Sequence, residues 1–273
     1  MVAASVLIPT HDHGRLLARS VASVQRQTRQ DFELFLIGDG ATRETRETAL
    51  ALAAEDPRIR FVEREKSPRT GEPYRHELLA EAKGWFVAYL ADDDLWLPDH
   101  LACMASLLET VDLVNAFLLR IHADGRPEPF FCDLARRGYV ARHLDERKPK
   151  NYLPLSCVAH RLDAYRRLPH GWRTTPAGTP TDLHMWRQWF ATPGMRFASA
   201  ERATVLNFPD GEWRERTPSE RDAALAEWLE RTSTPEGRLA LSEDLVARLR
   251  EEIVRGKGRP PRTPRNLFGL LRR

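Results

Sequence analysis

Three consecutive aspartates, Asp92, Asp93 and Asp94, follow the apolar run Trp85–Leu90 and Ala91. Adjacent carboxylates repel one another, so a fold that concentrates them at the end of a strand usually supplies a compensating cation. Such hard oxygen ligands suit Mg²⁺ or Mn²⁺, which commonly bridge protein carboxylates to substrate phosphates. The alternative is a solvated turn at the start of the next helix, where an aspartate favours the N-terminus.

On the N-terminal side of this turn, short runs of apolar residues alternate with segments in which apolar residues recur at helical spacing. We expect strands over residues 6–8, 32–37, 59–62 and 85–90, and helices over 16–24, 42–55 and 74–83. This alternation is typical of an α/β fold with a mostly parallel sheet and helices on both faces. Ligands of such sheets bind beyond the carboxyl ends of the strands. The loops with His11-Asp12-His13, with Asp39 and with the three aspartates should therefore converge on one edge.

The second half of the chain is less regular. We expect helices over residues 98–108 and 182–190, strands over 111–122, 155–159 and 203–208, and a loop-rich excursion over 126–154. From 219 to 254 the pattern predicts two charged helices, with Ser219 and Ser233 as caps and a break at Pro235. The expected packing positions of these two helices include Leu225, Trp228, Leu229 and Leu239.

The order and spacing of three segments resemble glycosyltransferase family 2, the inverting enzymes of GT-A fold. The segments are Val6-Leu7-Ile8-Pro9-Thr10, Leu36-Ile37-Gly38-Asp39-Gly40 and Leu90-Ala91-Asp92-Asp93-Asp94-Leu95-Trp96-Leu97-Pro98-Asp99. The resemblance covers about residues 4–210. It implies a catalytic domain over 1–212, with a nucleotide-binding half at about 1–98 and an acceptor half at about 99–212. A helical extension over 213–254 and a basic tail over 255–273, which we expect to be flexible, would follow.

The resemblance implies that Pro9, Thr10 and His11 line the pocket for the base of the nucleotide. Asp39 resembles the aspartate that accepts a hydrogen bond from the imide N–H of uracil, although a turn residue between glycines is the alternative. His11 takes a position where an aromatic residue is frequent, so it could stack on the base. A His-x-His metal pair with His13 and plain loop histidines are the other hypotheses. We favour stacking, because imidazoles are poor partners for Mg²⁺ or Mn²⁺.

The resemblance also indicates which residues bind the donor phosphates and the metal ion. Arg75 falls where the family often places an arginine near the donor, and its guanidinium could offset diphosphate charge. An exposed helical arginine is the alternative. Ala91 replaces the first acid of the family's turn. Asp93 therefore becomes the expected metal ligand, and Asp92 is expected near the ribose or the metal.

The expected general base is Asp182, in a segment that resembles the family's acidic segment ahead of a tryptophan-bearing helix. Inversion needs a carboxylate that removes the proton of the acceptor hydroxyl as its oxygen attacks the anomeric carbon. Thr181 departs from the glutamate that usually precedes the base. Asp182 could instead be the N-cap of that helix.

The implied function is transfer of a sugar from a nucleotide-diphosphate donor, a UDP- or dTDP-sugar, to the hydroxyl of an unknown acceptor, with Mn²⁺ or Mg²⁺ as cofactor. Sugar-phosphate nucleotidyltransferases use related sheets, but they usually show a glycine-rich loop after the first strand, and residues 10–15 contain one glycine. A nucleotide-sugar-binding relative without catalysis is the third hypothesis. Gly38 and Ala91, each in place of an acid, are its support.

The composition fits one α/β domain with appendages: 273 residues, 42% hydrophobic, 30% charged and a formal net charge of +3. A charge this small does not imply nucleic-acid binding. Three cysteines without metal-ligand spacing, and no predicted signal peptide or membrane span, lead us to expect a cytoplasmic protein. The tail over 255–273 has seven Lys or Arg and no acid, so it could contact the inner face of a membrane peripherally. A solvated tail is the alternative.

Overall fold

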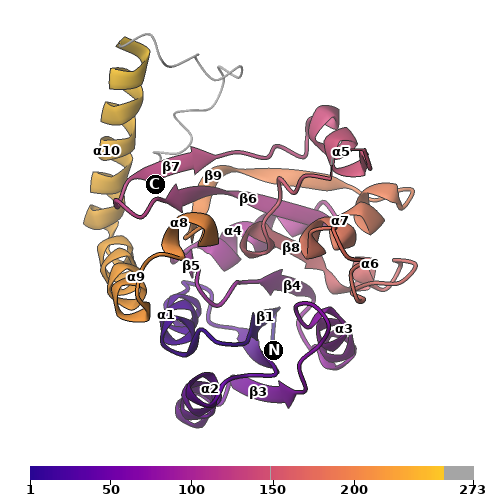
Figure 1. Ribbon diagram of the computed structural model, residues 1–273. Helices are drawn as coiled ribbons and strands as arrows, with labels where there is room; N and C mark the ends of the chain where they lie inside the picture. The colour runs from indigo at the N-terminus through magenta and orange to yellow at the C-terminus, as the bar shows by residue number, and fades with distance from the viewer. Residues whose placement is uncertain (148, 255–273) are drawn as a thin grey trace.

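The computed structural model describes residues 1–147 and 149–254. The described residues contain one nine-stranded sheet in the order β3-β2-β1-β4-β8-β6-β9-β5, with β7 paired to β6. Helices flank the sheet on both sides, and the two C-terminal helices stand along one edge of the molecule (Figure 1). The predicted α/β class is confirmed.

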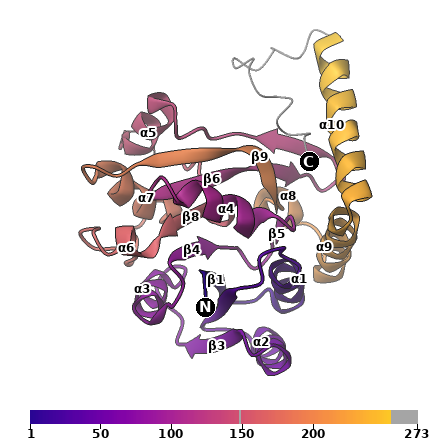
Figure 2. The ribbon, with the colours of Figure 1, turned by 180° about the vertical axis from the view of Figure 1, so that it is seen from behind.

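The N-terminal half is the parallel part of the sheet. Its strands are β1 (Ala4–Thr10), β2 (Phe32–Asp39), β3 (Ile59–Arg64) and β4 (Phe86–Tyr89). Its helices are α1 (Gly14–Gln25) and α2 (Arg43–Glu55) on one side and α3 (Glu72–Glu81) on the other (Figures 1 and 2). Because helices cover both faces, the centre of β1 is the apolar run Val6-Leu7-Ile8, whose side chains are fully buried. All predicted elements of this half are confirmed, with ends shifted by one or two residues.

The second half adds mixed pairings. Its strands are β5 (Leu95–Trp96), β6 (Leu113–Ile121), β7 (Pro127–Phe130), β8 (Val158–Arg161) and β9 (Phe197–Asn207). Strand β8 runs antiparallel between β4 and β6, whereas β9 is parallel to β6 and antiparallel to β5. Its helices are α4 (His100–Leu108), α5 (Arg137–Leu144), α6 (Leu162–Tyr165), α7 (Thr181–Ala191) and α8 (Asp210–Trp213), with a 3-10 turn η1 (Leu155–Cys157).

The described part of the segment over 126–154 is more ordered than predicted. Strand β7 carries two prolines, Pro127 and Pro129, and it joins the sheet only through β6, a position where a missing N–H is tolerated. Helix α5 is tied to α7 by Arg187, whose guanidinium donates to the backbone carbonyls of His143 at 2.8 Å and Asp145 at 3.1 Å. The sequence pattern missed both elements because neither buries a periodic apolar face. The strand predicted over 155–159 was also misplaced, because η1 takes its first three residues.

The charged C-terminal segment forms two helices, as predicted: α9 (Pro218–Ser233) and α10 (Pro235–Val254). The predicted cap Ser219 is wrong, because Thr217 caps α9. Thr217 Oγ1 accepts from the N–H of Glu220, and the Glu220 carboxylate accepts from the N–H of Thr217, which completes a capping box. Leu239 was also predicted wrongly: it is 57% exposed, and Leu241 is buried instead.

A second, smaller core joins these helices to the sheet. Its members come from α1, β5, β6, β9, α8, α9 and α10 and from the residues that directly follow β5 and β9: Leu16, Leu95, Leu97, Leu119, Ile121, Leu206, Phe208, Trp213, Leu225, Trp228, Leu229 and Leu241. Helix α9 is therefore packed against the end of the sheet that carries the acidic turn. No helix in residues 1–147 and 149–254 has the length and apolarity to cross a bilayer. The basic tail over 255–273, with its predicted flexibility and membrane contact, lies outside the described residues.

Candidate functional site

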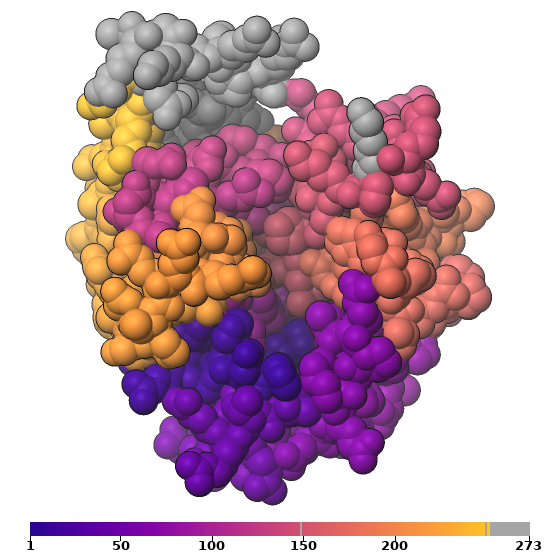
Figure 3. All heavy atoms as spheres, in the orientation of Figure 1, coloured from indigo at the N-terminus to yellow at the C-terminus, as the bar shows by residue number. Residues whose placement is uncertain are grey.

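The polar loops after β1, β2 and β4 meet at one edge of the sheet. His11 Nδ1 lies 2.9 Å from the backbone carbonyl oxygen of Asp39, and His13 Nδ1 lies 3.0 Å from Asp92 Oδ1. The two histidines of the first loop thus have different partners, one at the end of β2 and one in the acidic turn. Figure 3 shows that the molecule is hollowed on this face, between the indigo and purple N-terminal half and the orange and coral C-terminal elements.

Asp94 is the structural member of the acidic turn. It is 2% exposed and accepts hydrogen bonds from three donors, Ser156 Oγ at 2.5 Å, Asn207 Nδ2 at 3.0 Å and the N–H of Phe208 at 3.0 Å. Burial raises the pKa of Asp94 to about 6, although these hydrogen bonds favour the charged form. Its oxygens anchor the turn to η1 and to the end of β9.

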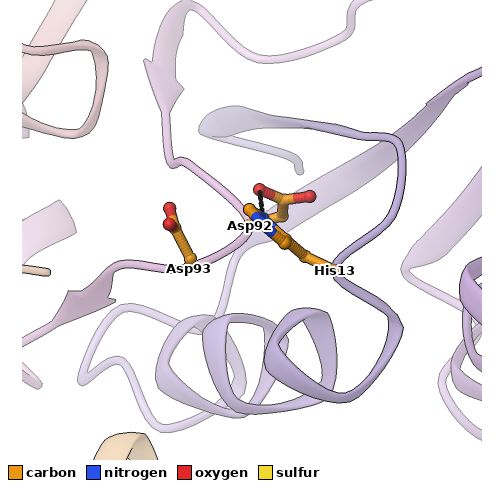
Figure 4. Close-up of side chains that lie close together, drawn as sticks. All are labelled: His13, Asp92 and Asp93. Carbon is orange, nitrogen blue, oxygen red and sulfur yellow. Dashed lines mark hydrogen bonds and ion pairs between the residues drawn. The ribbon is translucent and has the colours of Figure 1, made fainter. Parts of the chain in front are cut away.

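Asp92, Asp93 and His13 form the group that could hold a metal ion. One ligand atom from each lies within 4.8 Å of the others, and Figure 4 shows the His13 ring against Asp92 with Asp93 beside them. Burial and the neighbouring carboxylates raise the pKa of Asp93 well above its usual value, and the hydrogen bond to Asp92 raises the pKa of His13 to about 9. The two carboxylates fit Mg²⁺ or Mn²⁺, whereas the imidazole of His13 is a poorer ligand for these ions and would bind one only after losing its proton.

A protein cation already lies against this group. Arg221, on α9, places Nη2 at 2.9 Å from Asp93 Oδ2, and both side chains are 13% exposed. Its guanidinium also lies 3.5 Å from His13 Nε2 and 3.8 Å from Asp210 Oδ1. The positive charge offsets the mutual repulsion of the carboxylates. Sequence reasoning missed Arg221, because nothing distinguishes it from the solvated arginines of a charged helix.

Asp39 holds the loop between β3 and α3. Its Oδ1 accepts from the N–H of Ser67 at 2.6 Å, and its Oδ2 accepts from Lys66 Nζ at 2.6 Å and Ser67 Oγ at 3.0 Å. The buried carboxylate therefore organises residues 66–71 around the end of β2. Since a carboxylate offers about four lone-pair positions, these bonds leave room for one further donor.

The end of β1 lies directly beside Asp39. Parallel pairing sets Pro9 opposite Ile37 and Thr10 opposite Gly38. Thr10 Oγ1 is buried and has no hydrogen-bond partner in the described part of the chain. Pro9, Thr10 and His11 are thus brought together with Asp39, as the predicted nucleotide pocket requires. The roles assigned to them remain predictions.

Arg75, on α3, is 2% exposed and incompletely paired. Its Nη2 donates to the backbone carbonyl of Thr70 at 2.8 Å, and the guanidinium lies 4.7 Å above the Trp172 ring. Nε and Nη1 have no hydrogen-bond partner among residues 1–147 and 149–254. Burial lowers the pKa of Arg75, and the largest opposing influence is the charge of Asp182. A buried guanidinium with two free donors is suited to an anionic ligand. The alternative of an exposed helical arginine is wrong.

Asp182 lies in the first turn of α7 but is not its cap. Pro180 holds the N-cap position. Asp182 Oδ2 accepts from the N–H of Leu155 at 3.1 Å and from Asn151 Nδ2 at 3.4 Å, which joins α7 to the segment before β8. Burial raises the pKa of Asp182, and Arg75 partly opposes that change. A carboxylate with a raised pKa is the better proton acceptor.

A match to a protein family covers much of this site. The family described as glycosyl transferase family 2 matches residues 5–157, which is more than half of the chain. The chain belongs to glycosyl transferase family 2. The matched stretch includes the ends of β1, β2 and β4 and Arg75, whereas Asp182 and Arg221 lie beyond it.

Relatives within family 2 match shorter segments. An uncharacterized glycosyltransferase of Nostoc sp. is 31% identical over 112 residues, which are 41% of this chain and 34% of that protein. The UDP-Glc:alpha-D-GlcNAc-diphosphoundecaprenol beta-1,3-glucosyltransferase WfgD of Escherichia coli is 28% identical over 104 residues, which are 38% of this chain and 40% of that protein. The chain therefore spans well under half the length of these relatives.

Solved structures share the fold of this family 2 chain. The crystal structure of residues 1–349 of S. aureus TarS matches with a TM-score of 0.59 at 15% identity, over 84% of this chain and 71% of that chain. The same fragment in complex with UDP-GlcNAc matches with a TM-score of 0.58 at 15% identity, over 84% and 72% of the two chains. This likeness confirms the predicted GT-A fold.

Proposed function

We propose that this family 2 protein transfers a sugar from a nucleotide-diphosphate donor to an acceptor hydroxyl, with inversion. The observation that carries the proposal is the convergence of the loops after β1, β2 and β4 on one hollowed edge of the sheet, with His11 beside Asp39 and His13 beside the acidic turn. These contacts would supply a pocket for the nucleobase and a site for a cation. Arg75 and Asp182, whose charges influence each other's pKa, would supply a guanidinium for the diphosphate and a proton acceptor. The donor is a UDP- or dTDP-sugar, because Asp39 can accept from the imide N–H of a uracil or thymine ring.

Different residues of the chain would bind the nucleotide, the diphosphate and the metal ion. Asp39, with Thr10 and His11, holds the nucleotide, and the free N–H groups of Arg75 bind the diphosphate. Asp92 and Asp93, with His13, would hold Mn²⁺ or Mg²⁺, which would supply positive charge for the leaving diphosphate. In this division residues 1–98 bind the nucleotide, 99–212 bind the acceptor, and 213–254 form an extension.

Asp182 takes the acceptor proton in this scheme. It removes the hydroxyl proton while the oxygen attacks the anomeric carbon, and the bond to the diphosphate breaks on the opposite face, so the diphosphate leaves with the electron pair. The raised pKa of Asp182 increases its basicity. Its hydrogen bond to the N–H of Leu155 fixes the carboxylate relative to the sheet.

Two other functions are less well supported. A sugar-phosphate nucleotidyltransferase would need a glycine-rich phosphate loop after β1, and that loop has one glycine, Gly14. A nucleotide-sugar-binding protein without catalysis would not need a proton acceptor, whereas Asp182 is a carboxylate held by the N–H of Leu155 whose pKa is raised by burial.

The acceptor we propose is a saccharide carried on a lipid diphosphate. The names of two relatives support this class, the E. coli protein above and a Campylobacter jejuni GalNAc(5)-diNAcBac-PP-undecaprenol beta-1,3-glucosyltransferase, which is 28% identical over 100 residues. Such an acceptor would bring the protein to a membrane surface, where peripheral contact suffices.

Incubation with a panel of nucleotide sugars and Mn²⁺ tests the proposal. We expect slow hydrolysis of one donor without acceptor and faster transfer to a lipid-diphosphate saccharide. Asp182→Asn should reduce transfer by about 10²–10⁴ while the donor still binds. Asp93→Ala should weaken metal-dependent donor binding. A panel in which no donor binds with metal dependence and none is hydrolysed would refute the enzymatic proposal.

A further inference from the structure

Arg221 and a divalent cation would need the same carboxylate. The guanidinium reaches Asp93 Oδ2 from α9, and it also approaches His13 Nε2, so it lies against two of the three groups that could hold a metal. Two cations in contact with one carboxylate repel each other. Arg221 is 128 residues from Asp93 in the chain, so this contact depends on how α9 is docked.

Several contacts fix the position of α9 on α1. Asp222, the residue after Arg221, accepts two hydrogen bonds from the Arg19 guanidinium, at 2.7 and 3.2 Å. Near the other end of α9, Arg26 donates to Glu230 and Ser233, each at 2.6 Å. The capping box at the start of α9 and the apolar contacts of the second core add to this docking. The register of α9 against α1 is thus specified, and Arg221 is directed at the acidic turn.

We propose that Arg221 is a tethered cation that competes with the divalent metal for Asp93, so that the helical extension controls metal binding. This inference rests on the metal site proposed above. When a metal takes the Asp93 carboxylate, Arg221 must give up its ion pair, and its nearby acidic alternative is Asp210, whose Oδ1 already lies 3.8 Å away. The free protein should therefore bind Mn²⁺ more weakly than its carboxylates alone would.

Direct measurement of Mn²⁺ binding without donor tests the competition. Free Mn²⁺ is followed by electron paramagnetic resonance in wild type, Arg221→Gln and Arg26→Gln. The Arg26 variant is the matched control, because it removes another α1–α9 link far from the acidic turn. We expect Arg221→Gln to bind Mn²⁺ roughly 10-fold more tightly or better, within the usual range for coupled sites, and Arg26→Gln to match wild type. The gain should disappear in Arg221→Gln/Asp93→Asn.

The outcomes separate this inference from the proposed metal site. Equal or weaker Mn²⁺ binding by Arg221→Gln, with wild type still binding through Asp93, would overturn the competition and leave the site intact. If neither wild type nor Arg221→Gln binds Mn²⁺ at millimolar concentration, both the site and the competition are wrong.

A measurement on the wild-type protein guards against a variant that fails to fold. The side-chain Nε–H signal of Arg221 is followed by NMR during titration with diamagnetic Mg²⁺. We expect it to shift and to exchange faster with water as Mg²⁺ binds, whereas the Arg26 signal stays in place. An Arg221 signal that is unchanged at saturating Mg²⁺ would refute the competition.

Discussion

Replacing the buried Arg75 by methionine should separate donor binding from folding. The guanidinium makes one short hydrogen bond, to Thr70, and a cation–π contact with Trp172. Losing these costs about 1 kcal/mol and up to about 2 kcal/mol respectively. Removing the two buried nitrogens without partners in the described structure regains about 1–3 kcal/mol each. We therefore expect the free energy of unfolding of Arg75→Met to stay within about 2 kcal/mol of wild type or to rise.

Donor affinity should change far more. If Nε and Nη1 of Arg75 donate to the donor diphosphate, each charge-assisted bond contributes about 1.5–3 kcal/mol. Loss of both then weakens UDP binding by roughly 10²–10⁴, at 1.4 kcal/mol for each factor of ten. Isothermal titration of UDP in the presence of Mn²⁺ measures the affinity, and urea unfolding of the same samples measures stability.

The matched control is Arg60→Met, on β3, which removes an exposed guanidinium paired with Glu81. It should leave UDP affinity unchanged and alter stability by no more than about 1 kcal/mol. An Arg75→Met variant that unfolds readily but binds UDP with full affinity would refute the proposed role of Arg75 in donor binding. That result would make Arg75 a packing residue alone.

Three further predictions concern stability. Asp94→Ala leaves two buried donors and the partly buried amide of Asn207 unsatisfied, at about 1–3 kcal/mol for each buried donor. Urea unfolding should therefore show a loss of roughly 3 kcal/mol or more, with a smaller loss for Asp94→Asn. A loss below about 1 kcal/mol would contradict the structural role of Asp94. His160 is fully buried and burial lowers its pKa to about 4, so between pH 6.5 and 4 the unfolded chain binds a proton that the folded chain excludes. The free energy of unfolding should therefore fall by about 3 kcal/mol as the pH falls across this window. His160→Gln should remove this part of the pH dependence of stability. An unchanged pH dependence in that variant would contradict the role of His160. Thr217→Ala breaks the capping box of α9 and should lower the free energy of unfolding by about 1 kcal/mol, as measured by denaturant. Ser219→Ala is the control. Equal losses of stability in the two variants would contradict the assignment of Thr217 as the cap.

Much of the N-terminal half could be predicted from local patterns. Buried parallel strands leave uninterrupted apolar runs, such as Val6-Leu7-Ile8, and the helices between them leave amphipathic spacings. The rule that parallel strands present their carboxyl ends to ligands then places His11, Asp39 and the acidic turn on one edge. The edge strand β7 and helix α5 were not predicted, because neither element buries a periodic apolar face that would be visible in the sequence.

The loops that carry chemistry can be recognised in the sequence alone, because the pattern of strands along the chain and the composition of the loops are local properties. How the three adjacent aspartates differ depends on the packing of the folded chain. The Asp94 carboxylate accepts hydrogen bonds from segments that are distant in the sequence, namely from Ser156, Asn207 and Phe208. The Asp93 carboxylate instead forms an ion pair with Arg221. Such assignments depend on docking of β9 and α9 against the turn. No spacing along the chain encodes a contact between residues that only packing brings together.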